Sequence, residues 1–229
     1  MDKSYKIIIF GAGHLASLAH YYFQHDSNHE VVAFTVDKAY KNSDNYEGLP
    51  LIEFENIEMQ YAPSDFKMFL PISFKQMNNL REEKYLEAKK KGYSCVSYIS
   101  SKATTWPNLE IGENCFIFED NTIQPFVKIG NNCILWSGNH IGHHTTIGNH
   151  VFITSQAVIS GVCTIKDHVF IGVNATIRDE TILESYTLVG MGAIITKDTE
   201  YNTIHLGAKS TKHHKKSTDL DSISHKTKG

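Results

Sequence analysis

The amino-acid sequence predicts a small α/β part followed by a long parallel β-helix. The β-helix is predicted by an aliphatic residue that recurs at every sixth position from residue 111 to residue 195. A helix would need apolar spacing near about 3.6 residues, and an ordinary strand would alternate without a six-residue period. A fixed hexapeptide period is typical of a parallel β-helix, in which each block gives one short strand and one tight corner. The aliphatic positions are Ile111, Ile117, Ile123, Ile129, Leu135, Ile141, Ile147, Ile153, Ile159, Ile165, Ile171, Ile177, Leu183, Val189 and Ile195.

A second position of the repeat is also restricted, four residues after each aliphatic residue. It holds a small or β-branched residue apart from two asparagines, so both positions are expected to point into the coil. With three blocks per coil, residues eighteen apart would stack at about 4.8 Å, which places Cys115 over Cys133 and Asn121 over Asn139. Glycine often follows the aliphatic residue, where it would suit a corner that needs φ > 0. These glycines are Gly112, Gly130, Gly142, Gly148, Gly172 and Gly190.

Residues 1–99 are organised differently, because short apolar runs alternate there with helical patterns. This βαβ order predicts a small Rossmann-like unit, about half of a full dinucleotide-binding fold. The β-helix is expected over residues 100–207, and a Ser-, Thr- and Lys-rich tail, residues 208–229, is expected to be disordered. The expected strands are residues 5–10, 31–36, 66–70 and 95–99. A helical pattern follows residues 11–16 and runs to about Gln24, a second helix is expected over residues 74–91, and residues 38–50 are expected to form turns.

Composition and charge limit the possible functions. Hydrophobic residues make up 41% of the chain and charged residues 21%, which is ordinary for a soluble globular protein. The net charge of −3 gives no reason to expect nucleic-acid or membrane partners, and no apolar run approaches the roughly 20 residues that span a bilayer. Three of the four cysteines occupy inward repeat positions, so they are expected to be reduced core residues of a cytoplasmic protein. The first residues are expected to form a strand rather than a secretion signal.

The first expected strand and helix are joined by Gly11-x-Gly13-x-x-Ala16, a dinucleotide-binding fingerprint in its Gly/Ala form. Its backbone N–H groups and the helix N-terminus suit a phosphate. Asp37, at the end of the second strand, stands near the place of a ribose-binding acid. The motif suggests NAD, but half a fold has room for one nucleotide, so a nucleotide-linked sugar fits better. Without any ligand, the glycines would only make a tight strand-to-helix turn.

The combination of these two parts resembles the sialic-acid O-acetyltransferase family, which includes bacterial N-acetyltransferases acting on nucleotide-linked 4-amino-sugars. The resemblance covers about residues 5–207 and rests on the hexapeptide repeat and on the Gly-x-Gly-His start. It implies a left-handed β-helix, assembly as a homotrimer, and nucleotide-sugar contacts from Gly11, Gly13, His14 and Asp37. The usual loop of the family reads Gly-Ala-Ser-Gly-His, one residue longer than the Gly-Ala-Gly-His of this chain.

A pair of histidines is the expected chemical centre. In the repeat register His143 and His144 face outward at a corner. Acetyl transfer from a thioester needs a group that takes a proton near neutral pH, and histidine suits this task. Aligned on the family that the chain resembles, the catalytic histidine falls on His143. Gly142 stands where that family usually has an acid, and His144 stands where Asp or Glu commonly follows. Either another group sets the tautomer and basicity of His143, or His144 shares the task. A histidine without function would be a solvated corner residue.

Five histidines of the β-helix also raise the question of a metal site. Zinc would need three or four ligands that converge on one point. An outward-facing row along a solenoid need not converge, and no cysteine joins it, so no metal is expected. His140 is expected to be structural. The five residues are His140, His143, His144, His150 and His168.

The resemblance further implies acetyl-CoA, bound along the groove between neighbouring β-helices. Residues 170–177 and 188–193 match the coenzyme-binding segments of the family, although its usual Gly-Ala-Gly-Ala-Thr is changed here. Glycine lets the pantetheine arm approach the backbone closely, and a backbone N–H suits the thioester oxyanion. Lys197 suits a coenzyme phosphate and equally suits a solvated edge. The expected contacts are Gly172, Asn174, Gly190, Gly192 and Lys197.

These features predict an acetyl-CoA-dependent sugar N-acetyltransferase of surface-glycan synthesis. His143 would remove a proton from the sugar amine as it attacks the thioester directly, without an acyl-enzyme. Three alternatives stay open: an enzyme that acetylates a sugar hydroxyl, a non-catalytic β-helix scaffold that senses a nucleotide, and an NAD-dependent oxidoreductase. The sequence names neither the sugar nor the nucleotide.

Overall fold

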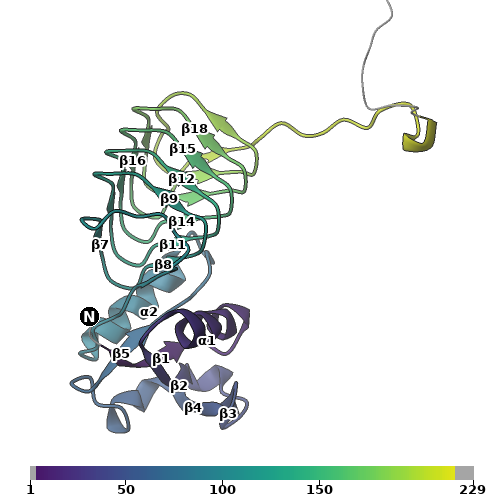
Figure 1. Ribbon diagram of the computed structural model, residues 1–229. Coiled ribbons are helices and arrows are strands. Elements are labelled where there is room, and N and C mark those ends of the chain that lie inside the picture. Colours follow the sequence, from purple (N-terminus) through teal and green to yellow (C-terminus); the bar gives the residue numbers. More distant parts are fainter. Residues whose placement is uncertain (1–3, 220–229) are drawn as a thin grey trace, which may run out of the picture.

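The computed structural model describes residues 4–219, which form an α/β part with a three-sided β-helix standing on it (Figure 1). The α/β part holds a five-stranded sheet in the order β3-β4-β2-β1-β5, parallel except for the β3–β4 pair. Its strands are β1 (Lys6–Phe10), β2 (Glu30–Val36), β3 (Asn45–Tyr46), β4 (Leu49–Glu53) and β5 (Phe66–Phe69), its helices are α1 (His14–Asp26) and α2 (Asn79–Lys90), and its short 3-10 helices are η1 (Lys38–Tyr40) and η2 (Phe54–Met59).

The sheet of the α/β part is buried between two apolar layers. Helix α1 buries Ala16, Ala19 and Phe23, which recur at the spacing of one helix face. These side chains pack on one face of the sheet. Helix α2 contributes Tyr85 and Ala88 to the apolar layer on the other face. From Ile7 to Phe10 β1 is buried, so this part of the strand is a continuous apolar run, as expected of a central parallel strand.

Three elements of this part differ from the sequence-based expectation. Strand β4 begins within the segment that was expected to form only turns and extends beyond it. Proline is unusual within a strand, so Pro50 argued against a strand here; in the structure Pro50 pairs only with the short β3. Helix α2 begins at Asn79 instead of residue 74, because the preceding residues 76–78 have positive φ. The expected last strand is divided, since Cys95 forms an isolated bridge to Met68 while β6 (Tyr98–Ile99) pairs with the first coil. The β-helix therefore starts two residues before the expected position.

The hexapeptide blocks form three parallel sheets whose strands are stacked as the repeat predicts. The register pairs residues eighteen apart, for example Ile129 with Ile147. The β7 sheet contains β7 (Glu110–Ile111), β10 (Lys128–Ile129), β13 (Thr146–Ile147), β16 (Thr164–Ile165) and β19 (Ile182–Leu183). The β8 sheet contains β6, β8 (Phe116–Ile117), β11 (Ile134–Leu135), β14 (Phe152–Ile153), β17 (Phe170–Ile171), β20 (Leu188–Val189) and β22 (Ile204–His205). The β9 sheet contains β9 (Thr122–Ile123), β12 (His140–Ile141), β15 (Val158–Ile159), β18 (Thr176–Ile177) and β21 (Ile194–Ile195).

The inward repeat positions form one continuous apolar core along the coil axis. Each fully buried aliphatic side chain of this kind contributes roughly 1.5–3 kcal/mol relative to an exposed one. Cys115, Cys133 and Cys163 lie in this core as free thiols, as expected, and Cys95 is a buried free thiol of the α/β part. The core explains why the small position of the repeat tolerates cysteine, alanine, threonine and valine equally.

The corners of the coil correct the prediction about glycine. None of the six repeat glycines is among the described residues with positive φ; their role is close contact, since a Cβ at Gly130 would lie 2.6 Å from Gly148 O. The positive φ falls three residues after the aliphatic position and is mostly adopted by other residue types. These are Asn114, Asp120, Phe126, Asn132, His144, His150, Gln156, Val162, His168, Asn174, Glu180 and Tyr186, with Gly138 and Gly192 as the glycines.

The β-helix joins the α/β part through the β8 sheet and its two flanking corners. Phe116 and Phe152 of that sheet enter the same apolar cluster as Phe23 and Phe69. At one flank, Tyr22 of α1 donates a hydrogen bond to Glu119 at 2.5 Å. At the other flank α2 packs on the corners that lead into the β8 sheet. The third corner of the prism, between the β9 and β7 sheets, therefore points away from the α/β part.

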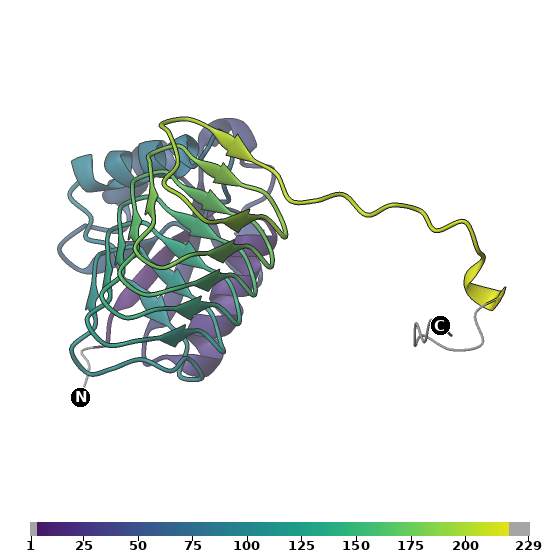
Figure 2. The ribbon, with the colours of Figure 1, turned by 90° about the horizontal axis from the view of Figure 1, so that it is seen from above.

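The chain beyond the coil extends away from the body, as Figures 1 and 2 show for the yellow segment. Residues 208–219 are exposed and contain only the 3-10 helix η3 (Ser217–Asp219). The expected disorder of the tail stays a prediction, and residues 220–229 lie outside the described part. Among residues 4–219, no helix combines the length and the apolar character that crossing a membrane requires.

The close contact of the repeat glycines is testable with Gly130→Ala. The new methyl group would meet the backbone of the next coil, and such overpacking costs about 1–3 kcal/mol. Urea unfolding followed by circular dichroism should show this loss. Gly13→Ala is the matched control, because a Cβ there would meet no heavy atom of residues 4–219 within 4 Å. Equal stability of the two variants would contradict the packing argument.

Candidate functional site

A cavity of about 870 Å³ opens at the carboxyl ends of β1 and β2. In open parallel sheets, ligands bind at this edge, beyond the carboxyl ends of the strands. The cavity walls come from the β1–α1 turn, from the segment that follows β2, and from residues 72–84, which include the start of α2. Lining residues include Gly11, Asp37, Tyr40, Tyr46, Lys75 and Lys84.

The β1–α1 turn shapes one wall of the cavity. Gly11 has φ +115°, which only glycine adopts readily, and its N–H donates to Thr35 O at 2.7 Å. Helix α1 has no acidic residue in its first turn, and no side chain of the described residues caps its N-terminus. Gly13 and His14 stand at this N-terminus, beside the cavity and not in its lining, and Tyr46 donates to Gly13 O at 3.2 Å. An uncapped helix N-terminus attracts anions such as phosphate.

Asp37 is not a free acid, because Lys84 of α2 reaches it across the cavity wall. Lys84 Nζ lies 2.9 Å from Asp37 Oδ1 and 3.0 Å from Glu87 Oε2. Burial lowers the pKa of Lys84, but the hydrogen bonds to the two carboxylates outweigh burial, so the pKa is raised. The ammonium group therefore stays charged at the cavity wall. Sequence reasoning missed Lys84, because nothing in a charged helix distinguishes one lysine from its neighbours.

His143 and His144 lie side by side at the corner between β12 and β13, and both are exposed. Their Nδ1 atoms are 3.1 Å apart, so one ring donates the hydrogen and the other accepts it. The His143 backbone N–H donates to Gln124 Oε1 at 2.8 Å, and the His144 ring packs against Phe126 with centroids 4.6 Å apart. The preceding coil thus holds the backbone of His143 and the imidazole of His144. Gln124 and Phe126 could have been found only from the eighteen-residue register.

Gly142, where the resembling family usually has an acid, faces the backbone of the next coil. A Cβ at Gly142 would lie 2.5 Å from Gly161 N, so a side chain there would displace the coil. Gly161 in turn lies under the His143 ring, since a Cβ at Gly161 would be 2.8 Å from His143 Nε2. The absence of side chains at Gly142 and Gly161 therefore leaves room for the next turn and for the His143 ring. The side chain that pairs with this ring is His144.

The cavity and the histidine pair do not meet within one chain. The pair occupies the corner that points away from the α/β part, and none of the described residues of this corner lines the cavity. The expected coenzyme contacts divide as well. Gly172, Asn174, Gly190 and Gly192 lie at corners between the β8 and β9 sheets, whereas the exposed Lys197 follows β21 on the histidine side.

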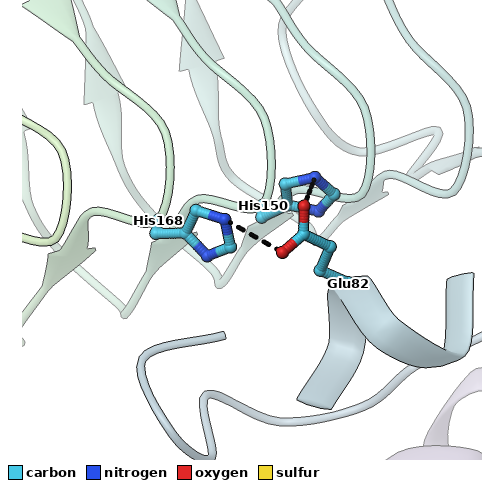
Figure 3. A group of neighbouring side chains, drawn as sticks. All are labelled: Glu82, His150 and His168. Carbon is cyan, nitrogen blue, oxygen red and sulfur yellow. Dashed lines mark ion pairs between the residues drawn. The ribbon is translucent and has the colours of Figure 1, made fainter. Parts of the chain in front are cut away.

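A second cluster of chemistry-bearing side chains lies where α2 meets the β-helix (Figure 3). His150 Nε2 lies 3.4 Å from Glu82 Oε1, and His168 Nε2 lies 3.3 Å from Glu82 Oε2. Both histidines are buried, at 8% and 5% exposure. Of the five histidines considered for a metal, the structure brings these two together with a carboxylate that the sequence did not single out.

The comparisons with known proteins agree with this architecture. The family described as bacterial transferase hexapeptide (six repeats) matches residues 108–142. No curated protein sequence matches the chain. The acetyltransferase domain of PglB from Neisseria gonorrhoeae superposes with a TM-score of 0.78 at 20% identity, over 88% of this chain and 96% of that chain.

Two further solved structures have the same organisation. PerB from Caulobacter crescentus, in complex with CoA and GDP-perosamine, gives a TM-score of 0.76 at 19% identity, over 88% of this chain and 94% of that chain. WeeI from Acinetobacter baumannii gives 0.74 at 21% identity, over 90% and 97%. The expected fold class, an α/β half-Rossmann part followed by a left-handed parallel β-helix, is confirmed. The resemblance on which it was based is thereby confirmed at the level of the fold.

The buried His150 makes the stability of the protein sensitive to acid. Burial, together with the nearby His168 and Arg81, lowers the pKa of His150 to about 4. Because the folded state favours the neutral ring, the contribution is complete above the unfolded pKa of about 6.5 and is lost as pH falls through about 4.

Replacing this ring should flatten the acid loss. His150→Asn extends the neighbouring asparagines and suits the positive φ of 60°. The free energy of unfolding, measured in urea at several pH values between about 7 and 4, should fall less steeply for His150→Asn than for the unchanged protein. His213→Asn, in the exposed segment, should follow the unchanged protein. Parallel curves for all three proteins would contradict the assignment.

Proposed function

We propose that this chain is an acetyltransferase that moves an acetyl group from acetyl-CoA to the amino group of a nucleotide-linked amino-sugar. The proposal rests on the occurrence, in one fold, of a nucleotide-sized cavity beside a glycine turn and an exposed, hydrogen-bonded histidine pair. Proteins of the same fold support it, because PerB was crystallised with CoA and GDP-perosamine and the PglB domain with acetyl-CoA.

The cavity in the α/β part would hold the nucleotide. The uncapped N-terminus of α1, where Gly13 and His14 stand, suits the diphosphate, and Gly11 keeps the turn close to the ligand. Asp37 would accept a hydrogen bond from the ribose through the oxygen that Lys84 does not bind. The 870 Å³ volume matches one nucleotide with a sugar better than a dinucleotide with its second half-fold missing.

His143 would act as the general base. With the shared hydrogen on His143 Nδ1 and accepted by His144 Nδ1, the Nε2 atom of His143 keeps its lone pair. The sugar nitrogen attacks the thioester carbonyl carbon, the C–S bond breaks, and the proton passes from nitrogen to His143 Nε2. The proton then neutralises the departing CoA thiolate. No acyl-enzyme is needed, and the four cysteines are buried.

A neighbouring copy would complete the site, as the homotrimer hypothesis requires. Within one chain the cavity and His143 do not meet, so a neighbouring chain must present the reacting amine to His143. The surface near the histidine corner carries exposed apolar side chains that suit such a contact: Phe126 at 61%, Val162 at 47% and Val158 at 41% exposure. Acetyl-CoA would lie along the groove between the β-helices of two neighbouring chains, against Gly172, Asn174, Gly190, Gly192 and Lys197.

The His143 assignment predicts the effect of two substitutions. His143→Ala should lower kcat by about 10²–10⁴, because the proton acceptor is removed, and His144→Ala should lower it less, because only the orientation of the ring is lost. Turnover is measured by release of CoA thiol, with UDP-, GDP- and dTDP-linked 4-amino-sugars as acceptors.

The control for this experiment is His205→Ala, a histidine of the same β-helix at the far end of the coil. It should keep full turnover, and size-exclusion chromatography should show one assembly state for all variants. Full turnover by His143→Ala would refute its role as base. An acetylated product that loses its acetyl group in mild base would identify an ester, and so an O-acetyltransferase.

The cavity assignment predicts a different kinetic signature for Lys84→Met. Loss of the ammonium group leaves Asp37 unpaired at the nucleotide, so the KM for the nucleotide-sugar should rise about tenfold while kcat changes little. Lys91→Met is the matched control, since Lys91 pairs with Glu58 outside this cavity. A rise in the KM for acetyl-CoA instead would place the nucleotide-sugar elsewhere.

A further inference from the structure

The Glu82–His150–His168 cluster belongs to a column of side chains at one corner of the coil. Asn114, Asn132, His150, His168 and Tyr186 follow one another at intervals of eighteen residues and face α2. The His150 and His168 rings are stacked with centroids 4.9 Å apart, and the His168 and Tyr186 rings with centroids 4.5 Å apart. Each ring is therefore held by its neighbours in the column.

Hydrogen bonds along the column fix the position of the hydrogen on His150. The backbone N–H of Leu70 can only donate, and it donates to Asn114 Oδ1 at 2.8 Å. Asn114 Nδ2 then donates to Asn132 Oδ1, and Asn132 Nδ2 donates to His150 Nδ1, each at 2.8 Å. His150 Nδ1 is therefore an acceptor. The hydrogen of the neutral ring lies on Nε2, which faces Glu82.

His168 has acceptors at both of its ring nitrogens. Its Nδ1 lies 3.2 Å from the carbonyl oxygen of Met77, and its Nε2 lies 3.3 Å from Glu82 Oε2. A neutral ring satisfies only one of these acceptors, whereas an imidazolium donates to both. The neighbours of this ring in the column are the neutral His150 and Tyr186, and Arg81 and Asp167 lie near His150.

A metal ion fits this cluster less well than a proton does. A metal needs the Nε2 lone pairs of both rings, but the asparagine chain leaves the lone pair of His150 on Nδ1, against Asn132. The ligand atoms of Glu82, His150 and His168 lie within 4.8 Å of one another, so the position of the hydrogen on His150, and not the spacing, opposes a metal. The geometry therefore favours the protonated His168.

The backbone that His168 contacts is unusual and leads directly to the cavity. Gln76, Met77 and Asn78 have φ of 55°, 50° and 70°, a region that residues other than glycine rarely adopt. Asn78 is fully buried, and its Nδ2 donates to His168 O at 3.3 Å. The cavity is lined by Lys75, which precedes this left-handed turn, by Gln76 of the turn itself, and by Lys84 of α2.

We propose that His168 is a positioning residue of the nucleotide cavity. In its protonated form it holds the left-handed turn through Met77 O and the helix α2 through Glu82, and it thereby fixes the wall formed by Lys75, Gln76 and Lys84. The inference rests on the proposed function for the identity of the ligand, and on the structure alone for the clamp. Loss of either contact of the ring loosens this wall.

The test uses His168→Asn, which suits the corner backbone and whose Nδ2 still takes the place of Nδ1 near Met77 O but is too short to reach Glu82, together with the shape-conserving Glu82→Gln. The KM for the preferred nucleotide-linked 4-amino-sugar should rise at least tenfold in His168→Asn and less in Glu82→Gln. The kcat and the KM for acetyl-CoA should stay within about twofold. His205→Asn is the matched control and should behave as the unchanged protein.

Hydrogen–deuterium exchange separates this inference from the proposed function. Faster exchange over residues 75–84 in His168→Asn, with the β-helix unchanged, supports the clamp even where no nucleotide-sugar is turned over. Unchanged exchange there overturns the clamp, and so does a loss confined to kcat. One equivalent of zinc per chain in the purified protein, absent from Glu82→Gln, would also overturn it in favour of a metal site. Absence of nucleotide-sugar turnover with the clamp intact would refute the proposed function alone.

Discussion

The stacking of one coil on the next, with residues eighteen apart in register, is the constraint on which the rest of the structure depends. It decides where glycine is required, because the backbone of the next coil occupies the space of a Cβ at Gly130 or Gly142. It places positive φ at every corner, so the chain accepts an unfavourable conformation many times in exchange for an unbroken apolar core. It also produces the column of like positions in which His150 and His168 stack.

The contact between the two parts depends on a buried cation rather than on apolar packing alone. The Arg81 guanidinium is fully buried, and burial lowers its pKa to about 10, which leaves it charged at neutral pH. It donates to Asn132 O and His150 O of the β-helix and to Asn78 Oδ1 of the left-handed turn. One side chain thus satisfies carbonyl groups of two coils and of the cavity wall, so the cavity is shaped partly by the β-helix on which it stands.

The sequence was most informative where a pattern repeats. The hexapeptide period predicted the coil, its stacking and its core, because fifteen equivalent positions report the same geometry. Prediction from the sequence failed where a single contact decides the structure. Pro50 argued against strand β4, and the left-handed turn before α2 contains no glycine that would have indicated it. His143 and His144 were visible as neighbours in the sequence, whereas Glu82 and His168 come together only through the packing of α2 on the coil.

The coil also gives every side chain a phase around its axis. Removal of one whole turn of the solenoid, such as residues 150–167, would shorten the prism but leave each remaining residue on its own corner. Removal of six residues ahead of His143 would rotate the remainder by a third of a turn and bring the imidazole pair to the corner that faces α1. Insertions and deletions in the β-helix therefore keep each side chain on its own corner only when their length is a multiple of the eighteen residues of a full turn.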